Sequence, residues 1–383
     1  MQIYVVSPGD TVDTIASAFQ VPVASIIFDN QLVYPYQLAV GQSLLLQDGA
    51  PPQRLRSVSV NGYAYPFISP WVLQETLPYL TDLSIFSYGF TSDGNLVPPL
   101  LSEEWMLDAA EAARTRPVLV LTPLGPDGRF NNELISSLVN NFTVQEQLLN
   151  QLIETMETLG YGGLDIDFEY IKAEDRDAFT EFVSRTVDTL SPLGYPVSVA
   201  LAPKTSADQQ GLLYQGKDYP ALGAIADHVL LMTYEWGYTY GPPMAVAPLS
   251  MVRRVVDYAV TEIAPGKIDL GIPNYGYDWP LPFVRGETAA TTIGNVEAVR
   301  LAVRYNAVIQ FDETAQSPHF YYENEGITHE VWFEDARSIR AKLGLIQEYG
   351  LRGAGYWQIM QWWRANWLLI DDMYTINKRS EGT

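Results

Sequence analysis

The sequence contains no cysteine and only three histidines among its 383 residues. The absence of cysteine excludes disulfide bonds, thiolate catalysis and cysteine-ligated zinc. So few histidines also argue against a histidine-rich metal site. We therefore expect neither a metal ion nor a cofactor.

Positive charge is also scarce, since 23 Lys and Arg residues stand against 45 Asp and Glu residues, a formal net charge of −22. Such a surface repels phosphate backbones and anionic membranes, so we expect no nucleic-acid and no membrane partner. Residues 1–20 have neither a basic start nor a continuous apolar run, and no later stretch is long enough for a membrane span. We expect a monomer made in the cytoplasm, without a signal peptide.

What the sequence does contain is enough apolar material for a large core. Hydrophobic residues make up 47% of the chain, which fits one large domain with one small module. Aromatic residues make up 12%, including 24 Tyr and 9 Trp. Such rings often line sugar-binding clefts, although core packing accounts for most of them.

Residues 1–48 have the pattern of a small unit of their own. Alternation predicts strands at Gln2 to Val6 and at Ser43 to Gln47. Helical spacing predicts helices at Thr11 to Phe19 and at Pro22 to Asp29, the first beginning after a capping Asp10-Thr11 pair. The predicted order is βααβ.

This unit resembles the LysM domain, a small module that binds glycans containing N-acetylglucosamine. The matching segments are Tyr4-Val5-Val6, Pro8-Gly9-Asp10-Thr11, Ile15-Ala16, Asn30 and Gly41-Gln42-Ser43-Leu44. The resemblance implies a ligand between the turn before the first helix and the loop before the closing strand. The implied glycan-binding residues are Gly9, Asp10, Thr11, Ile27, Asp29 and Asn30. The alternative is that these residues only provide the turns and caps of a small fold that has lost its binding.

After a linker at residues 49–56, rich in Pro and Gly, strand and helix patterns alternate. Eight strands are predicted, at Val58 to Tyr65, Asp82 to Phe90, Pro117 to Thr122, Gly163 to Glu169, Pro196 to Ala202, His228 to Tyr234, Ile268 to Tyr275 and Gly353 to Ile359. The fold class is α/β, a (β/α)8 TIM barrel over residues 57–374, whose sites lie at the C-terminal strand ends. We expect an α+β insertion at about residues 280–334, forming one wall of a cleft, and a tail at 375–383.

The fourth predicted strand carries a row of acids. In an extended chain Asp165, Asp167 and Glu169 share one face, with about 6.6 Å between successive members. Ionised carboxylates on a buried face are costly unless protonated or hydrogen-bonded, so the row is either solvated or functional. A metal site is less favoured, because three oxygens from one strand diverge.

Aromatic and polar residues end strands six to eight, in Tyr234-Glu235-Trp236, in Asn274 to Trp279 and in Tyr356-Trp357-Gln358. Together with the acid row they resemble family 18 glycoside hydrolases, the chitinase-like group, whose fourth strand carries D-x-x-D-x-D-x-E. Gly162 stands where that pattern has its first Asp. With the LysM-like unit, the chain is most similar to spore-cortex peptidoglycan N-acetylglucosaminidases, which implies a peptidoglycan or related N-acetylglucosamine polysaccharide partner in the spore coat, cortex or cell wall.

The resemblance also implies roles for single residues. Glu169 would protonate the glycosidic oxygen, Asp167 would orient the 2-acetamido group of the substrate, and Asp165 would share a proton with Asp167. Tyr234 would hydrogen-bond the acetamido carbonyl, and Trp357 would form the floor under the sugar. Further substrate contacts are expected from Glu235, Trp236, Asn274, Tyr275 and Asp278.

Alternatives remain open from the residues alone. Glu235 could be a protein nucleophile opposite Glu169, provided that the sixth strand has ended before it, since Tyr234 and Glu235 would otherwise face opposite sides. The barrel could be a glycan-binding or coat protein without activity. It could also be a chitinase that acts on chitin oligomers.

Overall fold

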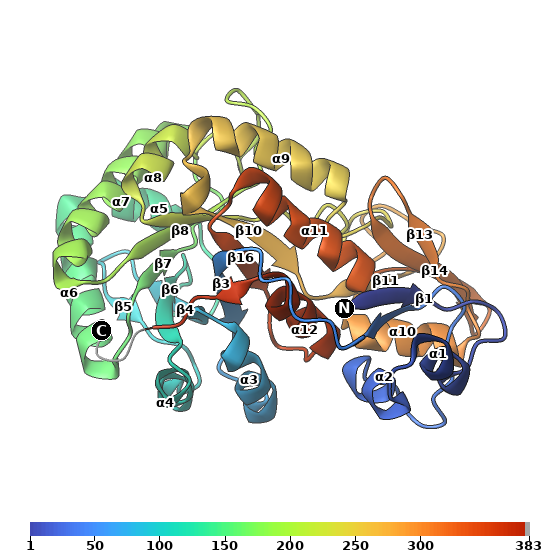
Figure 1. Cartoon of the computed structure of the whole chain (residues 1–383). Coiled ribbons are helices and arrows are strands. Elements are labelled where there is room, and N and C mark those ends of the chain that lie inside the picture. Colours follow the sequence, from blue (N-terminus) through green and yellow to red (C-terminus); the bar gives the residue numbers. More distant parts are fainter. Residues whose placement is uncertain (380–383) are drawn as a thin grey trace.

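The computed structural model describes residues 1–379, so residues 380–383 of the expected tail lie outside the described part. The described strands form three sheets: a two-stranded sheet near the N-terminus, a closed parallel barrel with short additions, and a five-stranded antiparallel sheet. Figure 1 shows the barrel at one end of the molecule and the two smaller sheets together at the other.

The N-terminal module has the predicted βααβ order. Its elements are β1 (Gln2–Val5), α1 (Val12–Phe19), α2 (Val23–Asp29) and β2 (Ser43–Leu46), and β1 pairs antiparallel with β2. Thr11 caps α1 by accepting a hydrogen bond from the Thr14 amide, and the Thr14 hydroxyl accepts one from the Thr11 amide. Apolar side chains such as Val12, Ile15 and Leu44 form a separate small core.

Eight parallel strands form the barrel, as predicted. They are β3 (Ser57–Ala64), β4 (Asp82–Phe90), β6 (Arg116–Leu121), β7 (Leu164–Ile166), β8 (Val197–Leu201), β9 (His228–Leu231), β10 (Ile268–Pro273) and β16 (Gly353–Trp357). Each pairs in parallel with its neighbours, and β3 closes the ring by pairing with both β16 and β4.

Helices pack around the barrel (Figure 1). They are α3 (Pro70–Thr76), α4 (Glu104–Ala112), α5 (Glu133–Val139), α6 (Phe142–Leu159), α7 (Arg176–Leu190), α8 (Tyr219–Ile225), α9 (Leu249–Glu262), α11 (Ala336–Tyr349) and α12 (Arg364–Met373). In α6, Leu148, Leu152 and Met156 recur at helical spacing and are fully buried, which explains its orientation on the sheet. Short 3-10 helices lie at Leu77–Tyr79, Ala173–Asp175, Ser191–Leu193 and Pro265–Lys267.

Some elements differ from the sequence prediction. The strand expected at Gly163 to Glu169 is shorter, because the ladders of β7 with β6 and β8 both end at Ile166. The helix α5 and the two-residue strand β5 (Leu96–Val97), which pairs with β4, were not expected. These short elements lack a long periodic pattern, the signal on which such predictions depend.

The insertion after β10 forms the antiparallel sheet. It contains β11 (Gly276–Pro280), β12 (Thr291–Ile293), α10 (Asn295–Arg304), β13 (Gln310–Asp312), β14 (Ser317–Asn324) and β15 (Ile327–Trp332), in the sheet order β12-β11-β15-β14-β13. It therefore begins at Gly276 rather than at about residue 280. The stretch predicted as one strand end belongs to two sheets, since β10 ends at Pro273 and β11 starts after Tyr275.

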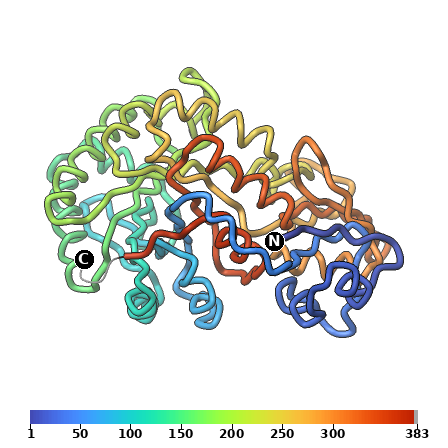
Figure 2. Tube along the Cα trace, viewed as in Figure 1, coloured from blue at the N-terminus to red at the C-terminus, as the bar shows by residue number. Residues whose placement is uncertain are grey.

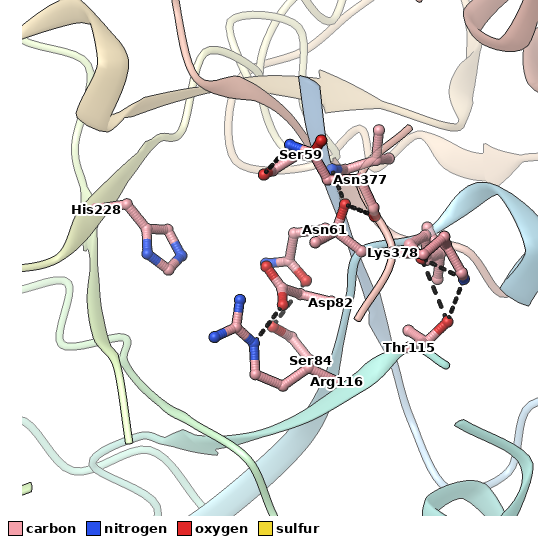
Figure 3. Close-up of polar contacts among 12 residues, drawn as sticks. Ser59, Asn61, Asp82, Ser84, Thr115, Arg116, His228, Asn377 and Lys378 are labelled. Atoms are coloured by element: carbon pink, nitrogen blue, oxygen red, sulfur yellow. Dashed lines mark hydrogen bonds and ion pairs between the residues drawn. The ribbon is translucent and has the colours of Figure 1, made fainter. Parts of the chain in front are cut away.

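The N-terminal end of the barrel is closed by charged residues and by the C-terminal segment (Figure 3). Asp82 accepts from Arg116 at 2.7 Å and from Arg352 at 3.3 Å. Strand β17 (Thr375–Ile376) pairs with β3, and Lys378 donates to the Thr115 hydroxyl at 2.8 Å. Residues 375–379, expected as a tail, are thus part of the barrel.

The N-terminal module packs against the far end of the same chain. In Figures 1 and 2 the module lies beside the insertion and near α12. Buried Asp29 accepts from Arg364 of α12 at 2.9 Å, and Val40 accepts from the Ile309 amide at 2.9 Å. Within residues 1–379 no single helix is long and apolar enough to cross a membrane, although α1 and α2 together, bent by 114°, pass that test by length and composition.

Candidate active site

The acid row begins in β7 and continues past its end. Asp165 is fully buried, Asp167 is 8% exposed, and Glu169 is half-buried, so exposure increases toward the C-terminal end of the barrel. The intervening Phe168 is buried on the other side, with ring centroids 5.5 Å from Phe90 and 6.1 Å from Phe182. Alternation therefore persists to Glu169 although the strand ladder has ended.

Asp165 is held by neighbouring strands. Its Oδ2 accepts from the Tyr63 hydroxyl at 2.8 Å, and its Oδ1 accepts from the Ser198 hydroxyl at 2.6 Å. Burial raises the pKa of Asp165, and these two hydrogen bonds oppose the rise. Both Asp165 oxygens thus have hydroxyl donors, and the structure shows no hydrogen bond that would represent proton sharing with Asp167 among residues 1–379.

Asp167 has a free acceptor atom. Its Oδ1 is buried and has no hydrogen-bond partner among the described residues. Burial, with repulsion from Glu169 and Asp165, raises the pKa of Asp167 well above its usual range. Burial also raises the pKa of Glu169. A carboxyl group whose pKa is raised, such as that of Glu169, suits general acid chemistry.

A buried cation contacts the backbone of this row. Lys217 is fully buried, and its Nζ donates to the Phe168 carbonyl, between Asp167 and Glu169, and to the Ala200 carbonyl at 2.8 Å. Burial lowers the pKa of Lys217 to about 8, while the carboxylates of Asp167, Glu169 and Asp165 oppose that change. Its positive charge lowers the pKa of all three acids.

A cavity of about 610 Å³ opens at Asp167 and Glu169. Its lining residues come from barrel strand ends and loops rather than from the insertion: Tyr65, Phe86, Phe130, Tyr170, Ala202, Pro203, Leu213, Tyr214, Met232, Tyr234, Glu235, Trp236, Tyr238 and Trp357. This size and aromatic lining suit a sugar ring or two. The structure thus brings Glu169, Asp167, Tyr234, Glu235, Trp236 and Trp357 together around one space.

Tyr234 and Glu235 line the same cavity despite being neighbours. Strand β9 ends at Leu231, so the alternation of a strand no longer applies to them. Glu235 adopts a left-handed conformation with φ of +66°, which turns its side chain to the side where Tyr234 points. Such a conformation is costly for a non-glycine residue and often marks a functional position.

Glu235 is held by two tyrosines. Its carboxylate accepts from the Tyr275 hydroxyl and from the Tyr277 hydroxyl at 3.0 Å. Partial burial raises the pKa of Glu235, and the two hydrogen bonds oppose the rise. The insertion therefore contacts the cavity residue Glu235 through Tyr277 of β11, although Tyr277 itself does not line the cavity.

Trp357, at the end of β16, belongs to an aromatic cluster at the cavity floor. Its ring centroid lies 5.1 Å from that of Phe86 and 6.1 Å from that of Tyr65. All three rings line the cavity. Apolar ring faces of this kind stack against the apolar face of a pyranose.

Three residues expected to contact substrate lie behind the cavity lining. Asn274 donates to the carbonyls of Gln358 and Gln361, at 3.0 and 2.9 Å, and so fixes the segment that follows Trp357. Tyr275 is buried and donates to Glu235. Asp278 accepts from the Tyr322 hydroxyl of the insertion at 2.5 Å, away from the lining residues.

The expected LysM residues fall into three sets. Asp10, Thr11 and Ile27 line a cavity beside the insertion. Asp29 is buried and bonded to Arg364, and the Asn30 side chain bonds the Ile26 and Leu45 main chains at 2.7 to 2.9 Å, so both hold the fold together. Gly9 is an exposed turn residue with φ of +87°.

Several residues of the site were missed in the sequence analysis. Tyr63, Tyr65 and Ser198 lie on predicted barrel strands, so a search along their inward faces would have found them. Lys217 lies in a loop without periodicity, where a lysine is expected to be exposed. Its loop reaches the acid strand because Gly216 packs on Ile171, whose carbonyl oxygen would lie 2.4 Å from any Cβ at that position.

Comparison with known families supports both modules. Residues 107–361 match the glycosyl hydrolases family 18, and residues 4–47 match the LysM domain. The chain is 40% identical to the cortical fragment-lytic enzyme of Bacillus subtilis (strain 168), over 99% of this chain and 100% of that protein.

Solved structures agree with that result. The crystal structure of the Bacillus megaterium QM B1551 spore cortex-lytic enzyme SleL superposes with a TM-score of 0.92 at 35% identity, covering 99% of each chain. The Bacillus cereus spore cortex-lytic enzyme SleL gives a TM-score of 0.82 at 38% identity, covering 99% of this chain and 88% of that one. With its acid row at the mouth of the barrel, the chain belongs to the family 18 glycosyl hydrolases and carries an N-terminal LysM domain.

Proposed function

We propose that this enzyme hydrolyses β-linked N-acetylglucosamine bonds in spore-cortex peptidoglycan, where its LysM domain retains it on the insoluble substrate. Full-length similarity to a cortical fragment-lytic enzyme supports the substrate class. The main structural support for the proposed reaction is that Glu169 and Asp167, whose Oδ1 has no hydrogen-bond partner among the described residues, line the same aromatic cavity.

The proposed mechanism is substrate-assisted and retains the anomeric configuration, as family 18 enzymes are exceptions to the two-carboxylate rule. Glu169 gives its proton to the glycosidic oxygen while the acetamido oxygen of the sugar bonds to C1. The C1–oxygen bond to the leaving group breaks, and an oxazolinium forms. Glu169 then takes a proton from water, which attacks C1 and reopens the ring.

The neighbouring residues would support these steps. Asp167 would accept the acetamido N–H at its free Oδ1 and stabilise the positive oxazolinium. Tyr234 would donate its hydroxyl proton to the acetamido oxygen, a role compatible with its pKa, which burial raises well above its usual range. Trp357 would hold the sugar from below.

The first test replaces the acid. Glu169→Gln removes the proton donor but keeps the shape of the side chain, so kcat/KM on purified cortex muropeptides should fall at least about a thousandfold. Circular dichroism and adsorption to cortex peptidoglycan should stay at wild-type values. Full hydrolysis by this variant would refute the assignment.

A second measurement tests whether the nucleophile is a protein carboxylate or the acetamido oxygen of the substrate. With a protein nucleophile such as Glu235, fluorination of the substrate's acetamido methyl should leave the rate almost unchanged. With the acetamido oxygen as nucleophile, fluorine withdraws electron density and each added fluorine should slow the reaction. Rates on a series of fluoroacetamido substrates distinguish the two mechanisms.

A further inference from the structure

Three of the predicted glycan-binding residues of the LysM domain, Asp10, Thr11 and Ile27, lie beside the insertion of the catalytic module. A cavity of about 900 Å³ is lined on one side by Asp10, Thr11 and Ile27 and by the loop at residues 35–39. Its opposite side is formed by the end of α10 and the residues after it: Ala302, Val303, Arg304 and Asn306. A ligand in the expected LysM position would therefore contact both modules.

The two walls are held at a fixed spacing. The Ile309 amide donates to the Val40 carbonyl at 2.9 Å, and Arg337 of α11 donates to the Gly41 carbonyl at 3.2 Å. Both contacts anchor the LysM loop that lines the cavity. Figures 1 and 2 show α1 and α2 beside α10 at this end of the molecule.

The groove continues along α10. A second cavity of about 440 Å³ shares Arg304 and the loop residues Pro35 and Gln37 with the first and extends to Arg300. The combined lining contains both polar groups, such as Thr11 and Gln37, and apolar ones, such as Ile27. That mixture fits pyranose rings, which present hydroxyl edges and apolar faces.

The insertion wall is positively charged in an acidic protein. Arg300 and Arg304 both lie 3.7 Å from the one carboxylate of Glu297, and their side chains are 47% and 61% exposed. One positive charge is therefore uncompensated on α10, although the chain has a net charge of −22. Four other acids line the two cavities. Asp10 accepts from the Tyr4 hydroxyl at 2.6 Å, and Asp13 is exposed at the start of α1. Glu334 is paired with Lys342 at 2.8 Å, and Asp335 is paired with Arg337 at 2.6 Å.

We infer that the LysM domain and α10 form one composite groove for a glycan that bears carboxylates. Peptidoglycan, whose sugar chain carries peptide stems, has this chemistry, so the inference rests on the proposed function and deepens it. The sugar rings lie against the LysM wall, and Arg304 donates to a carboxylate of the stem. An uncharged chain of N-acetylglucosamine would lie in the same groove without this charge-assisted hydrogen bond.

The test measures adsorption in the inactive Glu169→Gln background, so that binding is separated from hydrolysis. Adding Arg304→Glu should weaken adsorption to cortex peptidoglycan at least about tenfold, and binding to an N-acetylglucosamine hexamer by less than about threefold. The matched control is Arg254→Glu, the same charge change at an exposed position on α9 outside the groove, which should leave adsorption unchanged.

A second variant tests the opposite wall. Tyr36→Ala, on the LysM loop, should also weaken adsorption, and the Tyr36→Ala/Arg304→Glu double variant should lose less than the product of the single losses, because both belong to one site. Unchanged adsorption of Arg304→Glu, or equal losses on peptidoglycan and hexamer, would overturn the inference. If the wild type adsorbs by this groove yet leaves the cortex intact, only the proposed function fails.

Discussion

At the scale of single residues, Lys217 is the part of the site with the greatest influence on charge. A fully buried ammonium group is costly unless nearby anions or acceptors stabilise it. Here the carbonyls of Phe168 and Ala200 accept its protons, and three carboxyl groups lie within electrostatic range. Lys217 thus offsets part of the repulsion that the acid row would otherwise experience.

Replacing Lys217 should move the pH dependence of catalysis. Its charge lowers the pKa of both Asp167 and Glu169, so Lys217→Met should raise both. The two limbs of the kcat/KM profile, which the interacting Asp167 and Glu169 carboxyl groups set together, should then shift upward by about one pH unit. The measurement is the pH profile of kcat/KM on soluble muropeptides.

Lys204→Met is the matched control for that profile. Lys204 is also buried and donates to the Lys217 carbonyl at 3.1 Å, but the charges that act on it come from Asp218, Arg176, Glu262 and Asp208. Its loss should reduce stability without moving the pH limbs. A Lys217→Met enzyme that is slower but keeps the wild-type pH profile would show that Lys217 has only a packing role.

At the scale of elements, the start of β7 is where this chain departs from its family pattern. Gly162, in place of the first Asp, donates its amide to the Pro117 carbonyl at 2.8 Å. A Cβ at this position would lie 2.9 Å from Cγ of Arg116. That Arg116 side chain is fixed by its 2.7 Å hydrogen bond to Asp82, so it cannot move without loss.

Restoring a side chain at Gly162 should therefore destabilise the barrel. Gly162→Ala introduces the steric contact alone and should lower the free energy of unfolding by about 1–2 kcal/mol. Gly162→Asp adds a carboxylate that competes with Asp82 for Arg116, so it should cost at least as much. Urea denaturation gives both values, and an Asp variant more stable than the Ala variant would show that Arg116 can serve both acids.

At the scale of the whole molecule, the LysM domain is bound to the barrel through a buried ion pair. Arg364 donates to Asp29 at 2.9 Å, and its guanidinium lies 4.2 Å from the centre of the Phe28 ring. Arg364→Met should cost about 2 kcal/mol of unfolding free energy, because buried Asp29 loses its cationic partner. Urea denaturation followed by intrinsic fluorescence measures this loss.

Two further variants test whether the unpaired Asp29 carboxylate causes the stability loss of Arg364→Met. Adding Asp29→Asn to Arg364→Met should recover part of the stability, since no unpaired carboxylate remains buried. Arg253→Met, which breaks an exposed pair with Glu348 on the barrel surface, should cost under about 1 kcal/mol. Equal losses for Arg253→Met and Arg364→Met would mean that the LysM contact has no special role in stability.

The sequence by itself determined the periodic features of this protein. Apolar alternation and helical spacing were sufficient to predict the eight barrel strands, the βααβ module and the acid row, because these depend on neighbours along the chain. The family motif then pointed to Asp165, Asp167 and Glu169. It did so although Gly162 interrupts the pattern.

Only the tertiary structure decided which side chains meet across the fold. In the folded chain Lys217 contacts the backbone of the acid row, and Glu235 lines the cavity. Asp278 lies in the insertion sheet instead, and α10 lines one cavity together with LysM residues. The physical reason is that these contacts join distant segments through irregular loops. Their position depends on packing and on single backbone conformations, which leave no period in the sequence.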